Sequence, residues 1–325
     1  MTTGDFGVRV AIFASKQGPK LRLGLTPWNF GDLSAASLSA QAQFAESVGY
    51  ESFWLPENHF TERAIPDPLM LLASVAAGTK TIRLATTSFL LPLRNPLLAA
   101  EQVAVLDRLS NGRVLLGVGR GYSTQVLQAF NIEPGTKRRQ FEWTLDLMIR
   151  AWLGKPVAVD SDGDTAVVID PLPVQRPHPP IWIAAFGPKA LAQAGRLGMP
   201  YLASPIETLD ELRENFELHT DAVAAAGHPP VVTRPIMRVI FVSDNAAEIT
   251  ALRERLASNL LPTGRKPRAA VDDWVVVGDA NYVTDKLAQY KEELAATHIV
   301  VTRLRLDGIA ESKLRDSVAR VTELV

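Results

Sequence analysis

Residues 107–122 decide the fold, and they read Asp-Arg-Leu-Ser-Asn-Gly-Arg-Val-Leu-Leu-Gly-Val-Gly-Arg-Gly-Tyr. Asn111-Gly112 is typical of a helix end, because glycine can take the left-handed backbone conformation that closes a helix. The apolar run at 113–118 then predicts a buried strand. The stretch therefore predicts a helix, a buried strand and a glycine loop, which is one step of an alternating α/β chain.

The loop Gly119-Arg120-Gly121 has almost no side-chain bulk except one guanidinium. Backbone can approach a ligand closely at the glycines, and Arg120 offers a planar fork of donors suited to phosphate. A tight strand-to-helix turn with a solvated arginine is the alternative. The spacing G-x-G-x-G differs from the dinucleotide fingerprint G-x-G-x-x-G, which argues against an NAD site.

Eight strands alternate with helices along the chain. The strands are expected at 21–25, 50–55, 82–91, 113–118, 181–185, 200–203, 237–242 and 299–304. The helices are expected at 34–48, 67–77, 96–109, 141–152, 189–197, 209–226, 246–259, 282–296 and 311–324. Because consecutive parallel strands need a crossover, this alternation predicts a parallel sheet. Eight such units predict an α/β fold of the (β/α)8 TIM-barrel type, in a single domain at 21–325 after a loose segment at 1–20.

Two segments interrupt the alternation and are expected as surface insertions. The β-prone runs 157–159 and 166–169 flank an aspartate-rich turn, which predicts a hairpin. Residues 260–273, which contain Arg265, Lys266 and Arg268, are too polar and too interrupted for a regular element. We interpret this second segment as a lid over the barrel mouth, with a solvated excursion as the alternative.

Composition excludes several classes of function. Lys and Arg number 34 against 35 Asp and Glu, so nothing favours nucleic acid or an anionic membrane as partner. The chain has no Cys, which excludes disulfides, thiolate metal ligands and Cys nucleophiles. The five His residues are scattered, so no metal site is expected. The absence of a long apolar run and of a signal-peptide pattern leads us to expect a cytoplasmic protein.

The barrel prediction places the active site at the carboxyl ends of the strands. The candidate residues there are Trp28, Phe30, Asn58, His59, the run 86–91, Arg120, Phe186 and Gly187. They include no carboxylate pair, no Ser/His/Asp set and no lysine for a Schiff base. A site so poor in acids and bases needs a reactive cofactor, and its aromatic and glycine surfaces suit a flat ring with a phosphate on Arg120.

Three motifs in this order resemble the bacterial luciferase-like flavin monooxygenases, and the luciferase alpha subunit most closely. They are Glu57-Asn58-His59-Phe60-Thr61-Glu62, Leu84-Ala85-Thr86-Thr87-Ser88-Phe89-Leu90-Leu91-Pro92, and 107–113 followed by Gly117-Val118-Gly119-Arg120-Gly121. The segment 173–188 is also similar to the family. The resemblance covers 21–203 and extends to the remainder by topology.

The resemblance implies a flavin site built from these motifs. Arg120, with Gly119 beside it, would hold the flavin phosphate, and Phe186 and Gly187 would line the phosphate end. A non-prolyl cis peptide at Thr87-Ser88 would lie under the ring.

The resemblance also implies the catalytic residues. His59 matches the second histidine of the family's Glu-His-His-Phe motif, and Asn58 replaces the first, which assists catalysis in luciferase. His59 is expected to donate or relay a proton, with a structural hydrogen bond as the alternative. Because Asn58 departs from the pattern, light emission is not implied. Metal ligands are not implied either.

The function expected from the resemblance is an FMNH2-dependent monooxygenase. Reduced FMN from a separate flavin reductase would react with O₂ through a C4a-peroxyflavin and oxidise an apolar small molecule. Trp28, Phe30, Phe89 and Leu91 would shape the substrate pocket, although each is equally compatible with the core.

Two alternatives stay open. One is an F420-dependent oxidoreductase of the same fold, which transfers hydride, and the other is a non-catalytic flavin-binding protein. The resemblance further implies a homodimer that buries the helices at 67–77 and 96–109.

Overall fold

The computed structural model describes residues 20–158, 165–258, 269–303, 306 and 308–325. The segment expected to be loose, apart from Lys20, lies outside the described residues. The same is true of 260–268, the greater part of the expected lid with Arg265, Lys266 and Arg268.

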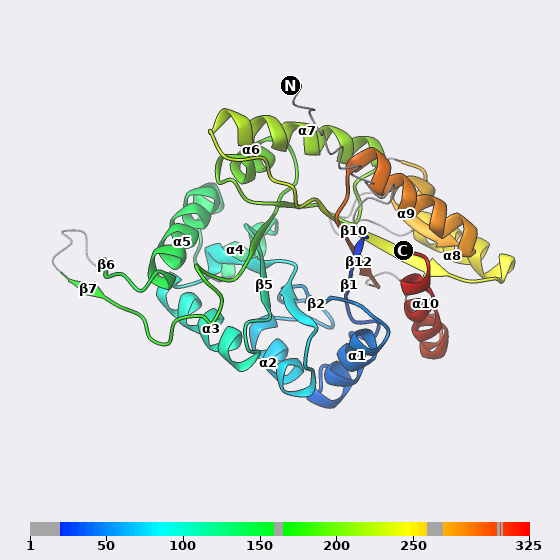
Figure 1. Ribbon diagram of the computed structural model, residues 1–325, viewed down its shortest axis with the longest axis horizontal. Helices are drawn as coiled ribbons and strands as arrows, with labels where there is room; N and C mark the ends of the chain where they lie inside the picture. Colours follow the sequence, from blue (N-terminus) through cyan, green and yellow to red (C-terminus); the bar gives the residue numbers. More distant parts are fainter. Residues whose placement is uncertain (1–19, 159–164, 259–268, 304–305, 307) are drawn as a thin grey trace, which may run out of the picture.

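A curled parallel sheet forms the centre of the molecule (Figure 1). Its strands are β1 Arg22–Leu25, β2 Ser52–Leu55, β3 Arg83–Thr86, β5 Val114–Gly119, β8 Ile181–Ala184, β9 Tyr201–Leu202, β10 Pro235–Val242, β11 Val275–Gly278 and β12 His298–Thr302. Their order is β11-β10-β12-β1-β2-β3-β5-β8-β9. The Ala203 N–H donates to the Pro235 carbonyl over 3.4 Å, which brings the end of β9 to the start of β10. The sheet thus curls on itself, and the expected α/β barrel fold is confirmed.

Strand β11 was not expected from the sequence. Strand β10 pairs with β12 over its first half, from Pro235 to Val239, and with β11 over its second half, from Val239 to Val242. Strand β10 has eight residues and extends beyond the end of β12, which leaves its last backbone N–H and C=O groups without a partner on β12. Strand β11 pairs with these groups. The apolar run Val275-Val276-Val277, between the expected lid and the next helix, could have predicted this strand.

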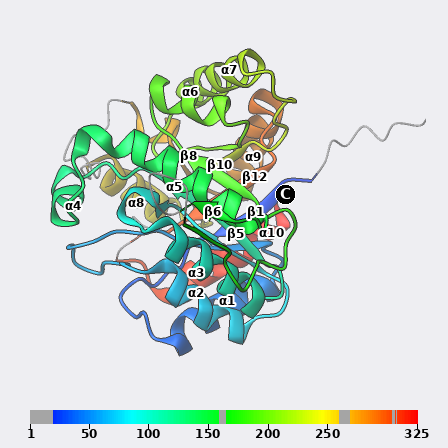
Figure 2. The same ribbon diagram turned by 90° about the vertical axis from the view of Figure 1, so that its left-hand side faces the viewer.

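The helices cover the outer face of the sheet (Figures 1 and 2). They are α1 Ala35–Ser47, α2 Pro68–Gly78, α3 Pro96–Leu109, α5 Lys137–Trp152, α6 Pro188–Arg196, α7 Leu209–Ala225, α8 Ala246–Ser258, α9 Ala280–Leu294 and α10 Glu311–Glu323. The start of α2 is as expected, because the Asp67 side chain accepts from the Met70 N–H and Pro68 occupies the first turn. The end of α3 is also confirmed, with Asn111 and Gly112 at φ 54° and 78°.

Short elements complete the fold. They are α4 Thr124–Ala129, β4 Phe89–Leu90 and the 3-10 turns η1 Leu91–Leu93, η2 Pro134–Thr136 and η3 Val271–Asp273. The expected surface hairpin is confirmed, since β6 Val157–Ala158 and β7 Ala166–Val167 pair antiparallel. Within the described ranges, no helix is both long enough and apolar enough to span a bilayer.

Side chains fill the inside of the barrel. Trp54 on β2 and Trp182 on β8 pack with ring centroids 5.3 Å apart. Small and medium residues from the other strands complete this inner cluster, namely Ala85, Leu115, Leu202, Met237 and Val300. The interior is therefore a packed core, and ligands must bind at an end of the barrel.

His298 gives the fold a pH dependence. The ring of His298, at the start of β12, packs edge-on against Trp182 with centroids 4.9 Å apart. Burial lowers the pKa of His298 from 6.5 to about 4, and the nearby charges of Arg22 and Arg83 add to this effect. Because the pKa is lower in the folded state, the neutral His298 ring makes its full contribution to the free energy of unfolding above pH 6.5. This contribution is lost as the pH falls towards 4.

We therefore expect His298→Gln to flatten the pH dependence of unfolding. Between pH 7.5 and pH 5 the wild type should lose about 1–2 kcal/mol more than the variant in urea denaturation. The exposed His228 provides the control, because His228→Gln should follow the wild-type curve. Parallel curves for wild type and His298→Gln would contradict the assignment.

Candidate active site at the barrel mouth

The run expected as one strand at 82–91 is divided into β3 and β4. The peptide between Thr87 and Ser88 lies between these strands and is cis, as the resemblance implied. Strand β4 then pairs with β5, with Phe89 opposite Val118. Below it, the Thr87 hydroxyl donates to the sulfur of Met237 over 3.1 Å. Residues 87–88, which we call the cis segment, thus lie on top of the packed barrel interior.

The glycines of β5 make room for the cis segment. A Cβ on Gly117 would lie 2.0 Å from the Thr86 carbonyl oxygen, and a Cβ on Gly119 would lie 2.1 Å from Ser88 Oγ. The Thr86 hydroxyl also donates to the Gly117 carbonyl over 2.7 Å. These two glycines are therefore required for packing against β3 and β4, in addition to any ligand that approaches the loop.

Arg120 follows β5 directly and is half-buried. Burial and the neighbouring charge of Arg138 lower its pKa. Across the described parts of the chain, its guanidinium has no hydrogen bond and no ion pair. Lys137 lies beside it, donates to the Gly121 carbonyl over 3.2 Å, and has a pKa lowered by burial and by Arg120. We call Arg120, Lys137 and Arg138 the cation cluster.

Glu142, whose charge acts on Arg120, is bonded to other partners. Glu142 raises the pKa of Arg120 only as a minor effect. Its carboxylate accepts from Gln193 Nε2 over 2.8 Å and from Arg196 on α6. The cation cluster therefore keeps an excess of positive charge at the barrel mouth.

A helix N-terminus lies beside the cation cluster. Strands β5 and β8 pair with Leu116 opposite Ile181 and Val118 opposite Ile183, so their ends are level. After β8 the chain passes through the exposed Phe186 to Gly187, which precedes α6 with φ 81° and without a side-chain cap. The positive end of α6 and the cation cluster together can hold an anion such as phosphate.

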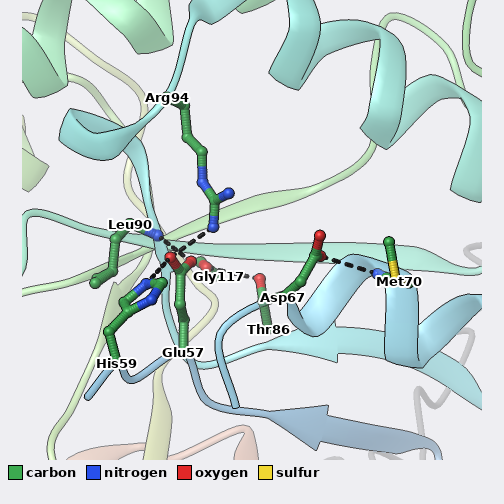
Figure 3. A network of polar contacts seen from close by, with 8 residues as sticks. All are labelled: Glu57, His59, Asp67, Met70, Thr86, Leu90, Arg94 and Gly117. Carbon is green, nitrogen blue, oxygen red and sulfur yellow. Dashed lines mark hydrogen bonds and ion pairs between the residues drawn. The ribbon is translucent and has the colours of Figure 1, made fainter. Parts of the chain in front are cut away.

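A buried carboxylate organises the part of the mouth beside β4 (Figure 3). The Glu57 side chain is 0% exposed. Its Oε1 accepts from His59 Nε2 over 2.8 Å and from Arg94 Nη2 over 2.5 Å, and its Oε2 accepts from the Leu90 N–H over 2.9 Å. The sequence interpretation singled out His59 but neither Glu57 nor Arg94. Glu57 is part of the motif at 57–62 and could have been predicted from it, whereas no sequence pattern indicates a role for Arg94.

Asn58 and His59 have different surroundings. The side-chain oxygen of Asn58 accepts from the Ile65 N–H over 2.6 Å, and the backbone N–H of Asn58 donates to the Ile65 carbonyl over 3.0 Å, so Asn58 closes the loop after β2. The ring of His59 instead packs against Phe130, with centroids 4.9 Å apart, and against Phe60 at 5.8 Å.

A cavity of about 440 Å³ opens between the loops after β1, β2 and β12. Trp28, Phe30 and Asn58 line it, as do Arg303, Leu306, Ile309 and Leu314 among others. Phe89 and Leu91 do not line it. Both are fully buried in the core, where Arg94 lies over the Phe89 ring at 4.4 Å. No cluster of potential metal ligands occurs in the ranges for which the structure gives positions.

Comparisons with known sequences agree with this geometry. The profile of the luciferase-like monooxygenase family matches residues 12–298. An uncharacterized protein of Sinorhizobium fredii is 31% identical over 221 residues, which are 65% of this chain and 62% of that protein. The alkanal monooxygenase alpha chain of Photorhabdus luminescens is 25% identical over 57% of this chain and 52% of its own. The chain thus spans between about half and three fifths of these relatives.

Solved structures share the fold. The oxygenating constituent of 3,6-diketocamphane monooxygenase from Pseudomonas putida, in complex with FMN, has a TM-score of 0.77 at 21% identity, over 94% of this chain and 98% of its own. The F420-dependent tetrahydromethanopterin reductase of Methanopyrus kandleri has a TM-score of 0.72 at 17% identity, over 94% and 98%.

The packing of the cis segment against β5 can be tested by filling one glycine. We expect Gly117→Ala to destabilise the protein by about 2–3 kcal/mol, because the backbone carbonyl of Thr86 cannot move away easily. The control is Gly135→Ala, where a Cβ meets nothing within 4 Å. Chemical denaturation measures both variants, and equal stability of the two would refute the close packing.

Proposed function

This chain belongs to the luciferase-like monooxygenase family, and we propose that it is an FMNH2-dependent monooxygenase that oxidises an apolar small molecule with O₂. Members of this family are flavin- or F420-dependent oxidoreductases, so the fold and the enzyme class follow from membership. The choice of FMN, the class of substrate and the source of electrons are the proposed part.

The cation cluster supports FMN. Arg120 is half-buried and has no partner in the part of the chain that the structure describes, while Lys137 and Arg138 add charge beside it. FMN ends in a phosphomonoester, which carries about two negative charges at neutral pH. F420 carries its phosphate as a diester with one charge, and its other negative charges are carboxylates further along its tail. A cluster of three cations beside a helix N-terminus therefore matches FMN better.

The barrel mouth fits the remaining parts of FMN. The cis segment and the loop 119–121 present backbone and small side chains, which leaves a surface suited to a flat ring. Bound reduced FMN would supply the electrons that activate O₂. The work of the protein would be to hold the phosphate at Arg120, to exclude water, and to accept or return a proton at His59.

The cavity supports the proposed class of substrate, and the sequence supports the proposed source of electrons. Trp28, Phe30, Leu306 and Ile309 form the apolar part of the 440 Å³ cavity, beside charged residues that include Arg303 and Glu311, and this apolar part supports an apolar substrate. The sequence carries no dinucleotide fingerprint, so we propose that a separate reductase supplies FMNH2.

Cofactor preference and oxygen chemistry test the proposal directly. The protein should bind FMN more tightly than riboflavin or F420 in fluorescence titrations. In an anaerobic mixture with reduced FMN, admission of O₂ and an apolar substrate panel of aldehydes and cyclic ketones should give oxygenated product. NADH alone should not reduce bound FMN.

The alternatives give different results in the same assays. Preference for F420 over FMN, with hydride transfer in the absence of O₂, would favour the F420-dependent reaction known from structures of the same fold. Tight FMN binding with release of peroxide only, over the whole panel, would favour a non-catalytic flavin-binding protein.

We expect Arg120→Ala to weaken FMN binding by about 1.5–3 kcal/mol, or roughly 10- to 150-fold in Kd. The reason is the loss of a charge-assisted contact with the phosphate. Arg139→Ala removes an exposed charge from the same region and should leave Kd nearly unchanged. Affinity for riboflavin should not change in either variant. An unchanged FMN affinity in Arg120→Ala would refute the phosphate assignment.

We also propose a homodimer through α2 and α3. Met70 on α2 and Leu98, Val105 and Leu109 on α3 are exposed apolar side chains, the most exposed being Met70 at 72% and Leu109 at 62%. Such a patch is typical of a protein interface.

Light scattering should give a dimer mass for the wild type at micromolar concentration and a monomer mass for Leu98→Asp. The control is Leu218→Asp on α7, on the other side of the molecule in Figure 1, which should remain dimeric. A monomeric wild type would rule out this interface.

A further inference from the structure

We propose that Glu57 is a positioning residue that holds the His59 ring with its proton on Nε2, so that Nδ1 becomes the proton-accepting atom at the barrel mouth. The proposal assigns Glu57 and Arg94 a role that the family motifs quoted above do not give them. Its use in catalysis rests on the proposed function, but the state of the ring does not.

The hydrogen bond between Glu57 and His59 has a defined direction. Glu57 Oε1 accepts from Arg94 as well as from His59, and Oε2 accepts from a backbone N–H. A carboxylate that receives three donors is ionised and has no proton to give. His59 Nε2 must therefore be the donor, 2.8 Å from the carboxylate oxygen.

The charges around Glu57 do not require a cationic histidine. Arg94 forms an ion pair with Glu57 at 2.5 Å, so this buried carboxylate already has a counter-charge. His59 Nδ1 has no hydrogen-bond partner in the described structure, and a protonated Nδ1 would need an acceptor. The ring with a proton on Nε2 alone satisfies every contact, and it leaves a lone pair on Nδ1.

Glu57 also fixes the ring relative to the cis segment. Leu90, which donates to Glu57, is two residues beyond the cis peptide Thr87-Ser88. The guanidinium carbon of Arg94 lies 4.4 Å from the ring centroid of Phe89, so this donor to Glu57 is also held by packing. One carboxylate thus joins the loop that carries His59 to the surface proposed to lie under the flavin.

This arrangement gives His59 one chemical role. His59 is 8% exposed and directly follows Asn58, which lines the cavity. In the proposed function, Nδ1 accepts a proton from a substrate or water that reaches the ring, and Glu57 stabilises the imidazolium that forms, because its carboxylate stays hydrogen-bonded to Nε2. The same atom returns the proton at a later step. The network therefore favours a base at this position over an initial proton donor.

The tautomer can be measured in the flavin-free protein by ¹⁵N NMR of labelled imidazole rings. His59→Gln assigns the signals. At neutral pH we expect a protonated Nε2 and an unprotonated Nδ1 in the wild type. A proton on Nδ1, or on both nitrogens, would overturn the proposal even if no variant at Glu57 folds.

Two variants then test the part played by Glu57. Glu57→Gln keeps an oxygen acceptor and should keep the proton on Nε2. Glu57→Leu/Arg94→Met removes the acceptor together with its counter-charge and should give a mixture of both tautomers. An unchanged tautomer in this double variant would also overturn the proposal. The exposed Glu254→Gln is the control and should leave the ring signals unchanged.

An FMN titration of the same samples separates this inference from the proposed function. If the wild type fails to bind FMN, the proposed function fails, while the ring signals still decide the role of Glu57. If FMN binds, its affinity in Glu57→Gln should remain within about twofold of the wild type, because in the described structure Glu57 bonds to His59, Leu90 and Arg94 and to none of the three cations of the cluster.

Discussion

The close packing of the cis segment against β5 is the contact on which the rest of the site depends. Gly117 and Gly119 allow the backbone of Thr86 and the side chain of Ser88 to approach where no Cβ would fit. Two residues beyond Ser88, the Leu90 N–H donates to Glu57. Because Glu57 also holds His59, the glycines of one strand determine where a histidine from another loop lies.

The charged side chains of the barrel mouth form two groups. At the ends of β5 and β8 the cation cluster has little compensation, since Glu142 is bonded to Gln193 and Arg196. Beside β2 and β4, Glu57 and Arg94 form an ion pair whose negative and positive charges neutralise each other. The cation cluster therefore attracts an anion, whereas the ion pair of Glu57 and Arg94 adds no net charge beside His59.

The packed interior explains why both groups lie at the mouth. Trp54, Trp182 and Met237 fill the barrel below the cis segment. The Thr87 hydroxyl bonds to the Met237 sulfur, which connects this core to the floor of the site. A ligand can then use only the loops above, and the cavity beside Trp28 and Phe30 is part of that space.

The sequence by itself determined the alternation of strands and helices, the helix ends at Asp67 and Asn111-Gly112, and the place of Arg120 after a buried strand, because these depend on local periodicity and backbone preference. The resemblance of its motifs to a known family also implied the cis peptide. Only the tertiary structure decided that Arg94 reaches Glu57, that Phe89 and Leu91 face the core, and that β11 extends the sheet. Those features join residues far apart in the chain, and the register of the curled sheet sets them, since a shift of one residue turns each side chain to the opposite face.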